Sequence, residues 1–204
     1  CYYFGNGVER NYSKSIQFYQ KAIELGNSYA ITNIGDCYYY GKGYQRNYTK
    51  AIEYYQRSAK LENPAAINKL GNCYYYGNGF MKNYSKAIEY FQRAIELGNS
   101  AALNNLGNCY YYGNGMKQDY TKAIECYQKS AQLDNSDAIK NLGNCYYNGN
   151  GVEKDYSKAI ELYQKSAELK NSVALNKLGD IYYNGNGMKQ DYSKAIEYYQ
   201  KSAE

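Results

Sequence analysis

The stretch GNCYYYGNG, residues 71–79, places one thiol and three consecutive tyrosines between glycines. The same nine letters return at residues 107–115, and close variants occur at 35–43, 143–151 and 179–187. The first glycine of each Gly-x-Gly recurs every 36 residues, at Gly5, Gly41, Gly77, Gly113, Gly149 and Gly185. A strict period of this length indicates stacked supersecondary units, so the motif is first considered as architecture.

Each unit is predicted to contain two helices joined by the glycine motif. In residues 65–76 the apolar side chains recur at the spacing of one face of an α-helix, which we call helix A. The residues on this face are Ala66, Leu70, Cys73 and Tyr74, with Ile67 beside them. Gly77 favours a left-handed end to the helix, and Gly79 lets the chain turn back tightly. We expect Gly71 to permit close packing between helices.

The second helix, helix B, is predicted to begin after Asn83. Its apolar side chains also follow helical spacing, at Tyr84, Ala87, Ile88, Phe91 and Ile95. The column of Asn83 contains only Asn and Asp, which an N-cap accepts equally well. Its members are Asn11, Asn47, Asn83, Asp119, Asp155 and Asp191. Three of them begin Asn-Tyr-[Ser/Thr] glycosylation sequons, but the exchange for Asp in later units favours capping.

The composition restricts the chemistry that is available. The 204-residue chain has 31 Tyr, four Phe, no Trp and no His. Without histidine it lacks the commonest general base, the commonest metal ligand and the usual partner of a Ser or Cys nucleophile. The net charge of +5 arises from basic and acidic side chains that are mixed along the chain. We therefore expect no enzyme, no cofactor and, without a concentrated basic groove, no nucleic-acid partner.

The six cysteines are predicted to be free thiols and not ligands or disulfides. Five of them form one column of successive A helices: Cys1, Cys37, Cys73, Cys109 and Cys145. Neighbouring helices lie about 8–10 Å apart, whereas a disulfide needs Cα atoms within about 7 Å. The chain has no Cys-x-x-Cys, and Ile181 fills the column in the last unit. Cys126 lies instead in a helix B column of aromatic and aliphatic residues. Burial of unpaired thiols is the best reading of this pattern.

A recurring motif runs through the chain: A-x-x-x-[LI]-G-x-x-Y-x-x-G-x-G, then [ND]-Y-[ST]-K-A-I, then Y-x-[KR]-[SA]-A. It resembles the Sel1-like repeat, a relative of the tetratricopeptide repeat, and covers the chain from end to end. In one unit its columns are Ala66, Leu70, Gly71, Tyr74, Gly77, Gly79, Tyr84, Ala87 and Phe91. Tetratricopeptide units run about 34 residues and lack the Gly-x-Gly, which makes that family the poorer match.

The resemblance implies an all-α fold, a right-handed α/α solenoid of 36-residue helix-turn-helix repeats whose A helices line the concave face. Residues 1–204 would form a single array of about five full repeats and a partial first unit. Family members serve as adaptors and scaffolds and are generally not catalysts. The secreted branch of the family carries paired cysteines, and their absence here favours the cytoplasm. The chain starts at Cys1, inside the last turns of a helix A, without an initiator Met or polar end repeats, so we expect a fragment of a longer protein.

A polar arc lies opposite the apolar one when each residue advances by about 100° around helix A. We call it the A-helix face and expect it to bind a protein or peptide. Its residues are Asp36, Tyr40, Asn68, Lys69, Asn72, Tyr76, Asn104, Asn105, Asn108, Tyr112, Lys140, Asn144, Asn176 and Asp180. An Asn amide both donates and accepts, so a ladder of amides would hold a peptide backbone while the tyrosines provide contact area. Alternatively, coding bias filled a solvated face with Asn. Tyr75 lies at the edge of the apolar arc and receives no role.

The sequence thus favours a non-catalytic, monomeric adaptor that binds proteins or peptides through the A-helix face. The alternative is a structural repeat array, or spacer, without a dedicated ligand. No apolar run approaches the roughly 20 residues that span a bilayer, so we expect no membrane insertion by this segment.

Overall fold

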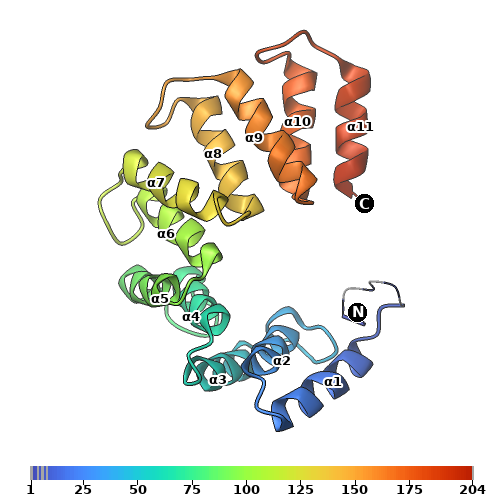
Figure 1. Ribbon diagram of the computed structural model, residues 1–204, viewed down its shortest axis with the longest axis vertical. Helices are drawn as coiled ribbons and strands as arrows, with labels where there is room; N and C mark the ends of the chain where they lie inside the picture. Colours follow the sequence, from blue (N-terminus) through green and yellow to red (C-terminus); the bar gives the residue numbers. More distant parts are fainter. Residues whose placement is uncertain (1, 4, 6, 8, 204) are drawn as a thin grey trace. The chain divides into compact units, whose positions relative to one another are not determined.

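The computed structural model describes residues 2, 3, 5, 7 and 9–203. This part of the chain contains eleven α-helices and no strand, which confirms the all-α repeat fold (Figure 1). The even-numbered helices correspond to helix A: α2 (Ser28–Tyr40), α4 (Pro64–Tyr76), α6 (Ser100–Tyr112), α8 (Ser136–Asn148) and α10 (Ser172–Asn184). The odd-numbered helices correspond to helix B: α1 (Tyr12–Glu24), α3 (Tyr48–Ala59), α5 (Tyr84–Glu96), α7 (Tyr120–Ala131), α9 (Tyr156–Glu168) and α11 (Tyr192–Ala203).

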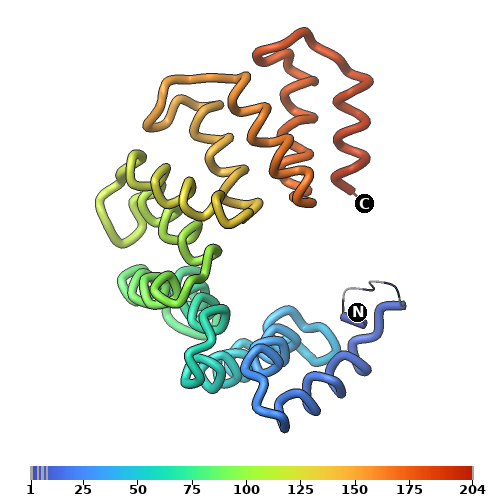
Figure 2. Tube along the Cα trace, in the orientation of Figure 1, coloured from blue at the N-terminus to red at the C-terminus, as the bar shows by residue number. Residues whose placement is uncertain are grey.

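The chain separates into two compact units, Cys1–Ala102 and Leu103–Glu204. In the first unit α1 packs on α2, α2 on α3, α3 on α4 and α4 on α5, and the A helices α2 and α4 also touch. In the second unit the same succession runs from α7 to α11. Figure 2 traces the alternation of A and B helices through the connecting loops. Within each unit these helices therefore pack against their neighbours in sequence.

The predicted caps of the B helices are present. Asn83 has an extended backbone, with φ −149°, and its side chain accepts a hydrogen bond from the backbone N–H of Lys86 at 3.0 Å. The same bond recurs throughout the column, at Asn11, Asn47, Asp119, Asp155 and Asp191. At the other end of a helix A, Gly77 takes the left-handed conformation, with φ 78°, as predicted. Satisfying the free N–H groups at a helix start explains why this column holds only Asn and Asp.

A second column of caps was not anticipated. Each A helix follows an Asn whose side chain accepts a backbone N–H of the first turn: Asn27, Asn63, Asn99, Asn135 and Asn171. Two of these also connect neighbouring repeats. Asn63 Nδ2 donates to Ser28 Oγ at 3.1 Å, and Asn171 Nδ2 donates to Asp137 Oδ1 at 3.0 Å. Much of the Asn content is therefore structural, and coding bias alone does not account for it.

The core of each repeat is a close approach between a glycine of helix A and a large ring of helix B. A Cβ placed on Gly71 would lie 2.6 Å from Cε1 of Phe91, so only glycine fits. The same contact pairs Gly35 with Tyr55, Gly107 with Tyr127, Gly143 with Tyr163 and Gly179 with Tyr199. The role predicted for Gly71 is confirmed, and it extends to its whole column. The ring therefore lies directly against the backbone of helix A.

The predicted burial of the cysteine column is confirmed where it is described. Cys37, Cys73, Cys109 and Cys145 are fully buried and free, and Ile181 is buried in the same column. Cys126 is free and only partly buried. Cys1 lies outside the described residues, as does part of the expected opening helix turn. The thiols act here as small apolar groups of the core.

Gly143→Ala is expected to lower the free energy of unfolding by about 1–3 kcal/mol, because the new Cβ would displace the Tyr163 ring. Without that ring, the same change inside a helix would stabilise the protein by about 0.5–1 kcal/mol. Urea unfolding followed by circular dichroism measures the difference. The exposed α9 variant Lys165→Ala serves as the control and should change stability by less than about 0.5 kcal/mol. An unchanged or increased stability of Gly143→Ala would contradict the close contact.

Candidate functional site

All residues predicted for the A-helix face lie on A helices, distributed over α2, α4, α6, α8 and α10. Their exposure differs widely. The rings of Tyr40, Tyr76 and Tyr112 are 53%, 59% and 63% exposed, respectively. Asn176 is also exposed, and most of the others are partly buried. The face therefore presents its tyrosines to solvent more openly than its amides.

In the first unit a charged cluster lies on α2 and α4. Asp36 Oδ1 accepts a hydrogen bond from the hydroxyl of Tyr55 at 2.6 Å and lies 2.9 Å from Lys69 Nζ. The Lys69 ammonium also lies 5.5 Å from the ring centroid of Tyr40. Burial opposes the charge of Lys69, but the adjacent Asp36 carboxylate outweighs it, and the pKa of Lys69 is raised. Lys69 and Asp36, both predicted ligand contacts, are therefore engaged with each other.

In the second unit an amide network lies on α6 and α8. Asn141 Nδ2 donates to Asn104 Oδ1 at 2.8 Å and to Asn108 Oδ1 at 3.2 Å. Asn108 Oδ1 also accepts from the hydroxyl of Tyr127 at 2.8 Å. A carbonyl oxygen has two lone pairs, so the acceptor capacity of Asn108 is filled. This amide is unable to clamp a peptide N–H and C=O together in the way the ladder hypothesis requires.

The same column has a structural role in both units. The hydroxyl of each B-helix tyrosine that packs on a contact glycine donates to the residue of helix A that follows this glycine. These pairs are Tyr55 with Asp36, Tyr127 with Asn108, Tyr163 with Asn144, and Tyr199 with Asp180. In the remaining repeat Phe91 has no hydroxyl to donate to Asn72. The constant separation of 19 residues between Asn or Asp and Tyr was the sequence signal that could have revealed this bond.

Two predicted contacts are corrected by their burial. Asn68 and Asn104 are each only 7% exposed, so neither is presented to a partner in the way that was expected. The reason is that their column faces helix B of the same repeat. Thr32, in that column, bonds Ser58 of α3 at 2.8 Å, and Asn176 accepts from Ser202 of α11 at 2.7 Å.

The column of Tyr75, which received no role from the sequence, connects neighbouring repeats through Tyr39, Tyr111 and Tyr147. The hydroxyl of Tyr39 accepts a hydrogen bond from Asn78 Nδ2 at 2.6 Å, and that of Tyr111 accepts from Asn150 Nδ2 at 2.6 Å. Tyr147 and Asn186 make the same bond. Each donor is the middle residue of the next Gly-Asn-Gly loop. The loop therefore ends its own helix and also fixes the preceding repeat.

A cleft of about 220 Å³ opens on the A-helix face of the second unit. It is lined by Tyr111, Tyr112, Tyr127, Asn141, Asn144, Asn148 and Lys177. Asn144 Nδ2 and the whole Asn148 amide make no hydrogen bond within the described part of the chain. Lys177 is only loosely paired, with Nζ 3.7 Å from Asp180 Oδ2. The cleft thus combines unused amide groups and a cation with the exposed Tyr112 ring.

The family comparison identifies the repeat. The Sel1 repeat model matches residues 1–27, 28–63, 64–99, 100–135, 136–171 and 172–204, which together span the chain. The chain belongs to the Sel1 repeat family. Proteins of this family are generally non-catalytic scaffolds for protein interactions. No curated protein sequence matches the chain.

Several solved structures resemble the chain. A Sel1 repeat protein from Oxalobacter formigenes is 32% identical, with a TM-score of 0.80 over 99% of this chain and 83% of that one. A protective antigen of uropathogenic Escherichia coli is 31% identical, with a TM-score of 0.66 over 99% of this chain but 43% of the antigen. An immunity protein from Pseudomonas aeruginosa is 23% identical, with a TM-score of 0.73 over 96% of this chain and 75% of that one. This last similarity establishes the shared fold alone.

The Sel1 repeats offer no cluster of three metal-ligating side chains among the described residues. Burial raises the pKa of the Cys145 thiol to about 12, so this thiol stays protonated and unreactive near neutral pH. No helix in the described ranges is long and apolar enough to cross a membrane. What the A-helix face provides is contact surface, in the form of rings and unused amide groups.

Asn144→Ala is expected to lower the free energy of unfolding by about 1–3 kcal/mol, because the buried Tyr163 hydroxyl loses its acceptor. Tyr163→Phe should lower the free energy of unfolding by less, since it removes the donor and leaves a partly exposed amide that water satisfies. In the Tyr163→Phe background the hydrogen bond is already absent, so Asn144→Ala should lower the free energy of unfolding only slightly. Urea unfolding of the two single variants and the double variant measures the coupling. Equal costs of Asn144→Ala in both backgrounds would contradict the structural role of this amide.

Proposed function

We propose that this Sel1 repeat protein is a non-catalytic adaptor that binds a protein or peptide segment through the A-helix face. The observation that carries the proposal is the exposure of three rings at the last residues of successive A helices, Tyr40, Tyr76 and Tyr112. Tyrosine provides a large amphipathic contact area at low entropic cost, and it is enriched among residues that dominate binding energy. Exposed rings repeated at one position of the fold support a contact role.

These rings are held in place before a partner arrives. Tyr40 meets the ring of Tyr39 edge to face at 4.9 Å, and Tyr112 meets Tyr111 in the same way at 4.9 Å. Each supporting ring is itself fixed by a hydrogen bond from the next Gly-Asn-Gly loop. Pre-positioned contacts lower the entropy lost on binding. This support favours a dedicated surface for a partner.

The cleft beside Tyr112 defines the chemistry of the partner. Asn144 Nδ2, the Asn148 amide and the Lys177 ammonium supply donors, while Asn141 and Asn148 supply unused amide oxygens. An extended peptide backbone presents both N–H and C=O groups at regular spacing and suits a cleft with both donors and acceptors. An apolar or aromatic side chain of the same peptide would pack on Tyr112. The proposal therefore replaces the amide ladder with ring contacts assisted by a few polar groups.

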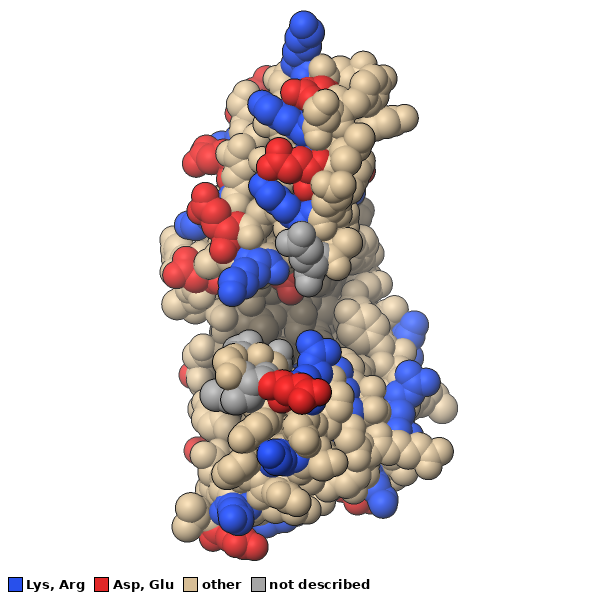
Figure 3. All heavy atoms as spheres, turned by 90° about the vertical axis from the view of Figure 1, so that its right-hand side faces the viewer, with Lys and Arg blue, Asp and Glu red and all other residues tan. Residues whose placement is uncertain are grey.

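The remaining features of the proposal concern partner class and location. Figure 3 shows Asp and Glu interspersed with Lys and Arg in its upper part and mostly separate Lys and Arg side chains in its lower part. On this face the cations form no continuous basic groove, which supports a protein partner over nucleic acid. We propose a monomer without a cofactor. The cytoplasm is the proposed compartment, because the described cysteines are free and buried.

One observation favours the spacer alternative. The amides of Asn104 and Asn108 serve hydrogen bonds inside the repeat array, and so does the carboxylate of Asp36. A polar A-helix face would arise from these structural needs alone, without selection for a ligand. The two functions differ in the role of the exposed residues Tyr112 and Asn148, neither of which makes a hydrogen bond within the described residues.

Selection of a random dodecapeptide display library on the immobilised protein, followed by fluorescence anisotropy of the enriched peptides, tests the proposal. Combining Tyr112→Ser with Asn148→Ala is expected to weaken binding at least tenfold, because it removes the ring and the free amide of one cleft. Tyr192→Ser removes an equally exposed ring from helix B and should leave the affinity within twofold.

Two results would favour the spacer. One is that no peptide is enriched, and the other is that Tyr192→Ser weakens binding as much as the cleft variant. Circular dichroism of all variants should match the wild type, since none of the three side chains lies in the core.

A further inference from the structure

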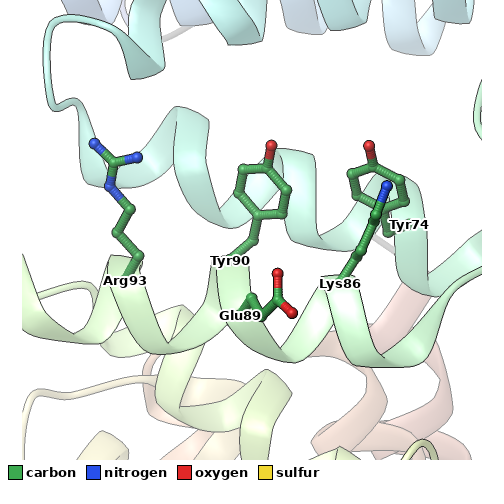
Figure 4. Close-up of a pocket in the computed structure, with 5 residues that line it drawn as sticks. All are labelled: Tyr74, Lys86, Glu89, Tyr90 and Arg93. Carbon is green, nitrogen blue, oxygen red and sulfur yellow. The ribbon is translucent and has the colours of Figure 1, made fainter.

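A second cleft, unrelated to the A-helix face, lies on the first unit between α4 and α5. It has a volume of about 270 Å³ and is lined by Tyr74, Lys86, Glu89, Tyr90 and Arg93 (Figure 4). The rings of Tyr74 and Tyr90 are stacked, with centroids 5.6 Å apart. The ammonium of Lys86 lies 5.4 Å from the Tyr74 ring centroid. Cations and rings thus line an open cleft on the surface.

The donors of this cleft have no acceptor. Neither the hydroxyl of Tyr74 nor that of Tyr90 makes a hydrogen bond within the described residues, and Arg93 forms no ion pair or hydrogen bond there. Figure 4 shows both hydroxyls pointing to the same side, toward which the Arg93 guanidinium also extends. By contrast, the hydroxyls of Tyr39 and Tyr55 are each paired. Two hydroxyls and a guanidinium that share one side form a set of donors suited to an anion.

Glu89 is the one acidic residue of this lining, and it does not neutralise the donors. Its carboxylate lies close to the α5 ribbon in Figure 4, away from the tips of Tyr74, Tyr90 and Arg93. Glu89 and Arg93 do not form an ion pair, although their spacing along α5 would permit one. The donor side of the cleft therefore keeps its positive character.

The charge of the chain is also concentrated in this unit. Residues 1–102 contain 12 Lys and Arg against 7 Asp and Glu, which gives +5. Residues 103–204 contain 12 of each, which gives zero. The whole net charge of the protein thus belongs to the unit that carries the cleft. A field of this sign attracts an acidic partner and speeds its encounter.

We propose that the cleft between α4 and α5 binds a Glu or Asp side chain of an acidic protein segment. The methylene groups of the ligand pack on the ring edges, and its carboxylate accepts hydrogen bonds from Arg93 and the neighbouring Tyr90 hydroxyl. A nucleic-acid base fits less well, because the Tyr74 ring is already stacked against Phe80 at 4.2 Å and against Tyr90. A base would need a free ring face, whereas a carboxylate side chain needs the ring edges and hydroxyls, which make no hydrogen bond within the described residues.

The next repeat provides a matched control within the same chain. There, Lys122 lies 5.6 Å from the ring centroid of Tyr110, as Lys86 does from Tyr74. The position of Tyr90 is taken by Cys126, and that of Arg93 by Lys129. Two cations are retained, but one hydroxyl and the guanidinium are lost. The equivalent position between α6 and α7 therefore lacks part of the donor set found between α4 and α5.

Fluorescence anisotropy with a labelled deca-glutamate peptide tests the proposal on the full chain. An equivalent arrangement of Tyr38, Lys50, Tyr54 and Arg57 lies between α2 and α3, so it is first removed by Lys50→Gln with Arg57→Gln. In that background, combining Lys86→Gln with Arg93→Gln is expected to weaken binding at least tenfold. Combining Lys122→Gln with Lys129→Gln removes the same charge from the control repeat and should weaken binding by less than threefold. Tyr90→Phe, which removes only one hydroxyl, should have an intermediate effect. Adding both Cys126→Tyr and Lys129→Arg should create a further equivalent site between α6 and α7.

Three results would overturn the proposal. Equal weakening by the two double variants would mean diffuse attraction to net charge, and a lack of saturable binding would mean no site. Tighter binding of a deca-thymidylate, lost with Lys86→Gln and Arg93→Gln, would assign the cleft to nucleic acid. The A-helix variant with Tyr112→Ser and Asn148→Ala should bind deca-glutamate as the wild type does, so failure of either proposal is distinguishable from failure of the other.

Discussion

The contact between a B-helix ring and an A-helix glycine determines how each repeat is built. In the repeat of α8 and α9, Tyr163 lies so close to Gly143 that no side chain fits between them, and its hydroxyl is bonded to Asn144. The ring supplies buried area, the glycine allows the helices to approach, and the Asn satisfies the hydroxyl that burial would otherwise leave unpaired. Removing any one of the three leaves a void, a clash or an unsatisfied polar group.

This contact explains why the A-helix face is divided between structure and binding. Wherever the B-helix ring belongs to a tyrosine, the residue after the contact glycine accepts a hydrogen bond from its hydroxyl. The column of Tyr39 and Tyr111 accepts hydrogen bonds from the following repeat. The most exposed residues lie at the ends of the A helices, namely the rings of Tyr40 and Tyr112 and the amide of Asn148. A binding surface on this fold is therefore available mainly at those ends, and our proposed function relies on them.

Much of the fold was predictable, because it follows from features that repeat along the chain. The period, the Asn and Asp caps at Asn83 and its equivalents, and the left-handed Gly77 each depend on local backbone chemistry. The site was less predictable because it depends on contacts between helices. A helical wheel gives the direction of Asn68 from its own axis, but not that helix B covers this direction and leaves Asn68 only 7% exposed. The bond between Asn108 and Tyr127 likewise joins two helices, and no single-helix pattern reports it.

Ionisation of the buried hydroxyls tests this account most directly. Burial raises the pKa of both Tyr127 and Tyr163 above the ordinary value, so the folded state resists their ionisation. Their contribution to stability is complete below about pH 10, where an unfolded tyrosine titrates, and is lost as the pH rises further. An NMR titration of ring-labelled tyrosines, assigned with Tyr163→Phe, should show both phenols protonated until the helices unfold. Ionisation of Tyr163 near pH 10, with the helical signal intact, would contradict the account.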